Sequence, residues 1–464
     1  MATSAVNLNS ILTAINGNSS SSGIDVSSAV SQIIYAEAAP VRQWQSQQAT
    51  LASQTTDLTT LNSLSSTLYD ALNALQDPVG ALTSLSVSSS NSSVVTASAT
   101  SGTATGTHVI TVANLASTAS WYSTSVASSS TQLSEGSFTL QVGSGDVQTI
   151  NVGGTSGVNT LDDLASYING QNLGVDASVI NDSTGARLAI VSQQSGKASD
   201  ITMSGSTGTG TTGLSFTQGS KGLDASITVD GVPVTSASNT VTGAVNGLTI
   251  NLLGTTSAGS QVNLTVAPDA TAASDGINAF VTAFNNLVNQ VNTEFTYNSS
   301  TKTSGPLAGD SVVRSLQAEL LSAMSYSTGS SNGASTLYSM GITMNDDGTL
   351  SVDSTTLTNA IQNNFSAVQQ FFQGTASNGF ANAVNNQLNM FTDPTEGAFT
   401  LDLQSISAEN TDLQNQINVF QDYLTNEQTR LTDEYNQADI LLQQLPSQTA
   451  QIQAMLGNNS SSNG

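Results

Sequence analysis

A long amphipathic pattern near the C-terminus is the feature that most limits how this chain can fold. Between Ile406 and Leu456 the large apolar residues recur at gaps of three, four or seven, and Gln, Asn, Asp and Thr fill the positions between them. This period is typical of a long amphipathic helix or a coiled coil. Such a helix gains most of its stability by packing its apolar face. The fold must therefore supply a second apolar surface to cover the first.

A second apolar stripe lies at the opposite end of the chain. Asp25 is placed to cap a helix that Pro40 should kink or restart, and the leucine spacing then continues until Asp77-Pro78. A shorter helical pattern follows from Asp275 to Val291. Because these segments need one another, we expect them to form an intrachain stem. Its predicted core is Leu51, Leu58, Leu61, Leu68, Leu72, Phe280, Phe284, Leu287, Leu413, Ile417, Phe420 and Leu424.

The middle of the chain has a different texture. From Thr83 to Pro268, short β-like runs alternate with clusters of Gly, Ser, Thr and Asn, and Asp230-Gly231 and Asn246-Gly247 are typical turns. One short helix is expected from Leu161 to Asn169, and a mobile loop from Ser204 to Gly213. The middle therefore predicts mainly β domains inserted between helices.

Further helices and a hairpin are expected after this region. Asp310 can cap a helix that continues to Met324, a hairpin should turn at Asp347-Gly348, and another helix should carry Leu357 to Phe372. The predicted fold class is α+β, with long terminal helices forming a helical bundle or coiled-coil stem. The expected parts are a partly disordered, coiled-coil-forming leg (1–40 and 432–464), a helical stem domain with a small hairpin (41–82 and 269–431), a β domain (83–118 and 222–268) and a second inserted β-rich domain with one short helix (119–221).

The composition argues against several classes of function. The chain has 464 residues and a formal net charge of -25, and its seven Lys and Arg residues are scattered, so nucleic acid is not an expected partner. No run of apolar residues approaches the length of a membrane span, so membrane insertion is not expected either. Cysteine is absent and His108 is the one histidine, in a β-alternating run. The sequence therefore predicts no enzyme, no catalytic residue, no metal site and no cofactor.

The N-terminal sequence and the lack of cysteine bear on the route of export. Met1 to Ser22 has no basic segment followed by a long apolar one, which a secretory signal would need. A chain without cysteine can cross a narrow channel unfolded without redox hazards. We expect a cytoplasmic protein, or one exported by a route that reads no cleaved signal peptide.

Four stretches of the sequence together resemble the flagellar filament cap family, FliD or hook-associated protein 2. The matching stretches, in chain order, are Gly23-Ile24-Asp25-Val26 with Glu37 and Pro40; Leu161-Asp162-Asp163-Leu164-Ala165 followed by Gly174-Val175-Asp176-Ala177-Ser178-Val179 and Arg187-Leu188-Ala189-Ile190; Gly305-Pro306-Leu307-Ala308-Gly309-Asp310-Ser311 with Arg314; and Gly341-Ile342-Thr343 with Asp347-Gly348-Thr349-Leu350 and Phe371-Phe372. The second stretch is similar to a motif repeated in flagellins and hook proteins. The order and spacing of all four carry the resemblance.

This resemblance implies a structural cap at the distal tip of the filament, which promotes insertion and folding of exported flagellin. It implies a ring-shaped homo-oligomer, with a pentamer expected, and flagellin as a partner. Hook-associated proteins and a flagellar export chaperone are further expected partners, and export would use the flagellar secretion apparatus. The residues expected to contact other subunits or the filament are Ile33, Ile34, Leu445, Ile452 and Leu456. Two alternatives stay open: another flagellar axial protein (a flagellin or hook–filament junction protein) and a non-flagellar surface adhesin.

Overall fold

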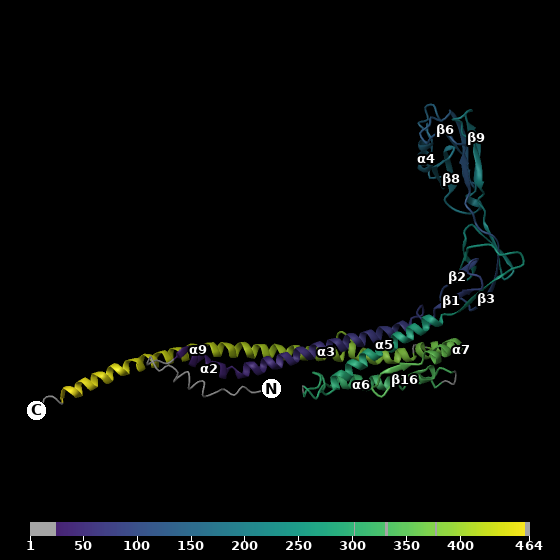
Figure 1. The fold of residues 1–464 in the computed structure, drawn as a ribbon. Helices are drawn as coiled ribbons and strands as arrows, with labels where there is room; N and C mark the ends of the chain where they lie inside the picture. The colour runs from purple at the N-terminus through teal and green to yellow at the C-terminus, as the bar shows by residue number, and fades with distance from the viewer. Residues whose placement is uncertain (1–24, 301, 330–332, 376–377, 460–464) are drawn as a thin grey trace. The chain divides into compact units, whose positions relative to one another are not determined.

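The computed structural model describes residues 25–300, 302–329, 333–375 and 378–459 (Figure 1). The chain divides into two compact units by its contacts. The helical unit comprises Met1–Asn73, Asn278–Ser354 and Gln370–Gly464, and the β unit comprises Ala74–Ile277 and Thr355–Gln369. The sheets lie in the middle of the sequence and the long helices near both ends, so the structure confirms the predicted α+β class.

The helical elements follow the apolar stripes of the sequence. Asp25 caps the first helix by accepting a hydrogen bond from the Ser28 N–H at 3.0 Å, and the break expected near Pro40 falls at Ala38. Pro40 then occupies the first turn of the next helix, where a missing N–H costs little. The helices are α2 (Val26–Glu37), α3 (Ala39–Gln76), α5 (Ala270–Phe295), α6 (Ser311–Ala323), α7 (Ser354–Gln373), α8 (Phe380–Thr392) and α9 (Ala398–Asn459), and the small hairpin is β16 (Ile342–Met344) with β17 (Leu350–Val352).

Aromatic side chains fill the centre of the helical unit. Phe371 and Phe380 stack with ring centroids 5.3 Å apart, and Phe280 meets Phe380 edge-on at 5.4 Å. All three side chains are completely buried. Tyr326 meets Phe371 edge-on at 5.6 Å, and its hydroxyl donates to the Asn378 carbonyl at 2.7 Å. This cluster joins α5, α7 and α8 through offset and edge-to-face contacts, which aromatic pairs prefer.

The β unit contains two separate hydrophobic cores. One core lies between a five-stranded sheet of order β1-β15-β3-β11-β12 and a three-stranded sheet of order β13-β14-β2. Its strands are β1 (Leu85–Ser89), β2 (Val95–Ala99), β3 (Gly106–Asn114), β11 (Ala225–Val229), β12 (Val232–Ser236), β13 (Thr240–Val245), β14 (Leu248–Leu252) and β15 (Val262–Pro268). The turn predicted at Asp230-Gly231 joins β11 to β12, and both of its residues have positive φ angles, 51° and 83°.

The other core lies between a four-stranded sheet of order β10-β4-β8-β7, a three-stranded sheet of order β6-β5-β9, and the helix α4 (Leu161–Gly170). The strands are β4 (Ser120–Ser123), β5 (Gly136–Val142), β6 (Gln148–Val152), β7 (Val175–Asp182), β8 (Gly185–Ser192), β9 (Ile201–Thr207) and β10 (Phe216–Ser220). Thr160 and Asp163 form a capping box at the start of α4, which confirms the predicted helix start.

The prediction of a loop from Ser204 to Gly213 is wrong for its first four residues. Ser204 to Thr207 belong to β9 and pair with β5 along its whole length. Strand pairing uses backbone groups, so a polar segment can pair without an apolar pattern. Gly205 has a φ of 94°, and a Cβ there would lie 3.2 Å from the Cα of Phe138, so glycine allows the close approach of the two strands.

The chain segment that forms each β core has its first and last residues paired with each other. Leu85 at the start of the β region pairs with Pro268 at its end. Within that region, Ser117 and Leu223 form an antiparallel bridge in which each N–H donates to the other's carbonyl, at 2.9 and 3.2 Å. The second core is built from residues between these two positions. The inserted segments are therefore nested, and each returns to the point from which it left.

Candidate interaction surfaces

The junction of α2 and α3 packs against α9 within the same chain. Val41, Ile417 and Leu424 form a small buried core. Trp44 meets Phe420 edge-on with ring centroids 5.6 Å apart, and the side chain of Gln48 donates to the Gln414 side chain at 3.2 Å. The N-terminal and C-terminal stripes are thus neighbours in this segment.

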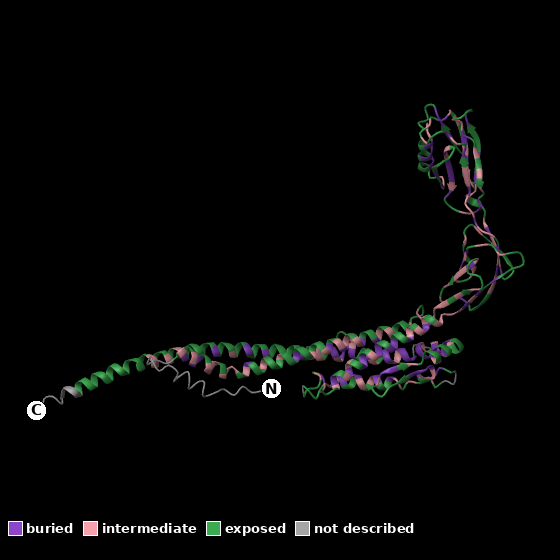
Figure 2. Cartoon of the chain, viewed as in Figure 1, coloured by how far each residue is buried: buried purple, intermediate pink, exposed green. Residues whose placement is uncertain are grey.

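The predicted stem residues lie mostly in the interior. In Figure 2 buried residues form a stripe along the helices of this unit. Phe420 is half-buried at the edge of the small core described above. The buried predicted residues are Leu51, Leu58, Leu61, Leu68, Leu72, Phe280, Phe284, Leu287, Leu413, Ile417 and Leu424.

The distal part of α9 has no neighbour in the described part of the chain that buries its apolar side chains. Leu431 is the last buried residue on this helix among those described. Beyond it exposed residues predominate as far as Met455 (Figure 2). The exposed large side chains of this segment are Ile440, Leu441, Leu442, Leu445, Ile452 and Met455. This distal segment, residues 440–455, is an apolar stripe that the described part of the chain leaves exposed.

The five predicted contact residues fall into three groups. Leu445 and Ile452 are 49% and 55% exposed and lie in the distal segment of α9. Ile33 and Ile34 are half-buried on α2, and Ile34 packs against the chain's own core around Val41. The side chain of Leu456 lies outside the described residues.

Carboxylates surround the loop between α5 and α6. Glu294 on α5 is buried, and its Oε2 accepts a hydrogen bond from the Leu307 N–H at 3.1 Å. The Gly305 N–H donates to the Glu294 carbonyl at 3.1 Å. Burial raises the pKa of Glu294, and the negative charge of Asp57 raises it further. The loop is therefore hydrogen-bonded to Glu294, whose carboxyl group ionises at a higher pH than an exposed glutamate does.

A second pair of carboxyl groups lies at the end of the same loop. Asp310 caps α6 by accepting hydrogen bonds from the N–H groups of Val312 and Val313 at 2.7 and 3.1 Å. Burial of Asp402 on α9, with a hydrogen bond to Asp310 and the charge of Asp310, raises the pKa of Asp402 to about 6. The Oδ2 atom of Asp402 is buried and accepts no hydrogen bond from the described part of the chain. Asp402 therefore keeps its proton to a higher pH than an exposed aspartate does.

His108 is hydrogen-bonded to the turn between β11 and β12. His108 Nδ1 lies 2.8 Å from Asp230 Oδ2, and the other oxygen of Asp230 accepts from the Val109 N–H at 2.8 Å. The hydrogen bond from His108 lowers the pKa of Asp230. Because Asp230 lies in the turn between β11 and β12, this bond stabilises the turn. Among the described residues, no three His, Cys, Asp or Glu side chains are grouped as metal ligands would be. Nor does any described helix have the length and hydropathy to cross a membrane.

Sequence reasoning missed two parts of this geometry. It did not anticipate α8, although Phe380, Val384 and Leu388 repeat at helical spacing and are buried. It also did not anticipate the pairing of Asp310 with Asp402. For α8 the apolar spacing was a usable signal, whereas nothing in the sequence pairs two acids so far apart in the chain.

Family models match most of the chain. The model described as the flagellar hook-associated protein 2 N-terminus matches residues 22–119, and that of the flagellar hook-associated protein 2 C-terminus matches residues 222–447. The flagellin hook IN motif matches residues 137–194, which lie between them.

Individual relatives agree with these matches. The chain is 27% identical over 473 residues to a flagellar hook-associated protein 2 of Escherichia coli, covering 95% of this chain and 98% of the relative. It is 28% identical over 318 residues to the B-type flagellar hook-associated protein 2 of Pseudomonas aeruginosa, covering 62% and 66%. It is 30% identical over 172 residues to a Helicobacter pylori flagellar hook-associated protein 2, covering 37% and 25%. The matched part therefore spans just under two thirds of the Pseudomonas relative and a quarter of the Helicobacter one.

A solved structure shares the fold. The flagellar cap protein FliD D1-D2-D3 domains from Escherichia coli superimpose with a TM-score of 0.56 at 25% sequence identity. The superposition covers 76% of this chain and 99% of that structure.

Proposed function

The chain belongs to the flagellar hook-associated protein 2 family, and from this premise we propose that it is a structural cap at the distal tip of the bacterial flagellar filament. In this role it promotes the insertion and folding of exported flagellin subunits. The observation that carries the proposal is that one fold matches the Escherichia coli flagellar cap protein across nearly all of that structure, with family matches on both sides of the inserted β domain.

The structure supports a conformational rather than a chemical role. The distal segment of α9 offers exposed apolar side chains on a helix, which suits contacts with other helices. The inserted β domains are covered largely by Ser, Thr, Asn and Gly, which suits surfaces that meet without strong adhesion. A cap that makes and breaks contacts with successive subunits needs such surfaces, and it needs no bond to be made or broken.

The proposal includes the partners and the location. The chain associates with further copies of itself in a ring, with a pentamer as the expected form, and it contacts flagellin. Hook-associated proteins and an export chaperone are further partners. The protein is exported by the flagellar secretion apparatus and resides outside the cell. Leu445 and Ile452 are the contact residues that the exposed surface of α9 favours, with Ile33 and the exposed part of Ile34 adding to them.

Filament growth tests the proposal directly. In a strain whose own cap gene is deleted, the unaltered chain should restore long filaments and reduce the flagellin monomer lost to the medium. The double variant Leu445→Ser with Ile452→Ser should restore neither. A matched variant, Gln444→Ser with Gln451→Ser, changes exposed polar residues of the same helix and should behave as the unaltered chain.

The rival functions give different results. Electron microscopy of the purified protein should show closed rings. Long helical filaments formed by the protein alone would point to a flagellin-like axial protein instead. Display on the surface of a strain without a flagellar export apparatus would favour an adhesin.

A further inference from the structure

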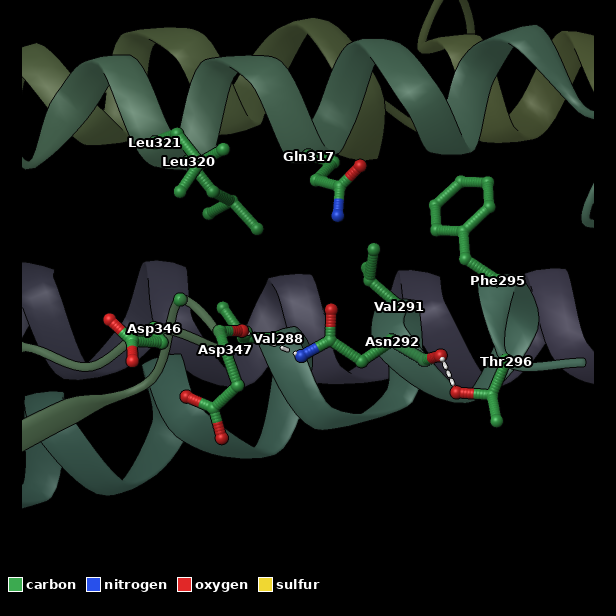
Figure 3. Close-up of a pocket in the computed structure, with 11 residues that line it drawn as sticks. Val288, Val291, Asn292, Phe295, Thr296, Gln317, Leu320, Leu321, Asp346 and Asp347 are labelled. Carbon is green, nitrogen blue, oxygen red and sulfur yellow. Dashed lines mark hydrogen bonds between the residues drawn. The ribbon is translucent and has the colours of Figure 1, made fainter.

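The helical unit contains an open groove with apolar and acidic lining residues, and the proposed cap function assigns no role to it. It lies between α5, α6 and the turn that joins β16 to β17, and its volume is about 470 Å³. Figure 3 shows Leu320 and Gln317 of α6 pointing toward Val291 and Phe295 of α5, with the turn at one end. The groove residues are Val288, Val291, Asn292, Phe295, Thr296, Gln317, Leu320, Leu321, Asp346, Asp347 and Gly348.

Apolar residues lie beneath the groove and continue into a neighbouring hollow. Val288, Val291 and Leu320 are buried beneath the groove, whereas Leu321 is 44% exposed. Leu321 also lines a neighbouring hollow of about 350 Å³, where Met344 is 52% exposed. The two hollows thus share Leu321, which lies between their apolar residues. Such hollows can accept several large side chains from one face of a helix.

The turn at the end of the groove is rigid and negatively charged. Asn292 of α5 donates to the Asp347 carbonyl at 2.8 Å. The carboxylate of Asp347 accepts from the Thr349 N–H at 3.0 Å and from its hydroxyl at 2.6 Å, and these bonds lower the pKa of Asp347. Asp346 beside it is exposed. Two acidic residues therefore lie at one end of a groove whose lining contains no Lys or Arg, and the carboxylate of one of them, Asp347, is fixed by hydrogen bonds.

We propose that this groove binds an amphipathic helix of a partner protein that carries Lys or Arg next to its apolar face. The apolar residues of the helix would cover Leu321 and fill the space above Val291 and Leu320. Its cationic residue, or its positively polarised N-terminus, would lie beside Asp346 and Asp347. The charge of the groove favours this occupant, because an acidic helix would meet the carboxylates of Asp346 and Asp347 with no Lys or Arg among the lining residues to compensate.

A peptide pair measures both parts of the proposed recognition. The probe is a fluorescein-labelled helix about four turns long, with leucines spaced three and four residues apart and lysines elsewhere. Its control has glutamate in place of every lysine. Fluorescence anisotropy with the full chain should show the lysine peptide binding at least about tenfold more tightly than the glutamate peptide, which corresponds to about 1.4 kcal/mol.

Two variants and their controls locate the site. Leu321→Asp should weaken binding of the lysine peptide by about tenfold, although it adds a negative charge that would strengthen non-specific attraction. Leu401→Asp adds the same charge at an exposed leucine of α9 and should not weaken binding. Asp346→Asn should weaken binding a few-fold, whereas Asp146→Asn at an exposed turn should not. Circular dichroism confirms that each variant is folded, and Leu321→Ala repeats the test with a milder change.

Three results would overturn the proposal. Equal binding of the two peptides would remove the charge argument, and equal loss in the Leu321 and Leu401 variants would place the binding elsewhere. Sedimentation that shows copies of the unaltered chain separating on Leu321→Asp substitution would make a second copy the occupant.

Discussion

Replacing Asp402 with asparagine should stabilise the helical unit at neutral pH. The pKa of Asp402 is raised to about 6 in the folded chain by burial and by Asp310, from an ordinary value of 3.8. A raised carboxyl pKa means that the folded chain binds the proton more tightly than the unfolded chain does. The resulting penalty on folding is therefore absent below about pH 4, grows as the pH rises, and is fully present above about pH 6.

The size of the effect follows from the shift. A shift of about 2 pKa units corresponds to at most about 3 kcal/mol. Asp402 is only half-buried, so solvent screening reduces the expected gain to about 1 kcal/mol. Asparagine keeps the shape and removes the charge that Asp310 opposes. For a unit of this size, the melting temperature at pH 7 should rise by about 2–4 °C.

Thermal unfolding followed by circular dichroism at about pH 7 and about pH 4 checks this reasoning. The difference between Asp402→Asn and the unaltered chain should be large at the higher pH and small at the lower one. Asp412→Asn, on an exposed position of the same helix, should change the melting temperature at neither pH. An Asp402 variant that is less stable at neutral pH, or equally shifted at both pH values, would refute the raised pKa assigned to Asp402.

Two further substitutions test the packing of the helical unit. Phe380→Ala should destabilise it by about 3–5 kcal/mol in chemical denaturation, because it empties the centre of the aromatic cluster, whereas Met390→Ala, 70% exposed on the same helix, should cost under about 0.5 kcal/mol. Gly305→Ala should cost about 1–3 kcal/mol, because its Cβ would lie 2.5 Å from the Glu294 carboxylate and 2.6 Å from the Glu294 Cα. Gly309→Ala should be close to neutral, because nothing lies within 4 Å of its Cβ, and an equal loss in both glycine variants would contradict the steric argument.

The helices were predictable where burial imposes a period on the sequence. The leucines from Leu51 to Leu72 lie on one buried face, so their spacing alone identified α3. The hairpin at Asp347-Gly348 was predictable because a turn with a glycine at positive φ leaves a local signature. The end of β9 was not, because Ser204 to Thr207 pair through their backbones and carry no apolar alternation.

The surfaces were harder to predict, because they combine distant segments. The groove joins Val291 of α5 to Leu321 of α6 and to Asp346 of the hairpin turn, and only the folded chain brings these together. The sequence could point to Leu445 and Ile452 as contact residues, because they continue the apolar stripe past the segments able to bury it. It could not show that Ile34 has part of its surface covered by the same chain.

In the β region, both the whole segment and the segment inserted within it begin and end at paired residues. This arrangement affects which insertions and deletions the fold can accept. Ser117 and Leu223 are hydrogen-bonded to each other, so a short loop could join them and remove everything between without removing a strand of the core formed by β1 to β3 and β11 to β15. The same pair of residues is an insertion point for a foreign domain whose ends lie close together. Because Leu85 pairs with Pro268 in the same manner, the region has two interchangeable cassettes, one inside the other. The segment between Ser117 and Leu223 can then be exchanged while the strands outside it and the helical unit keep their own contacts.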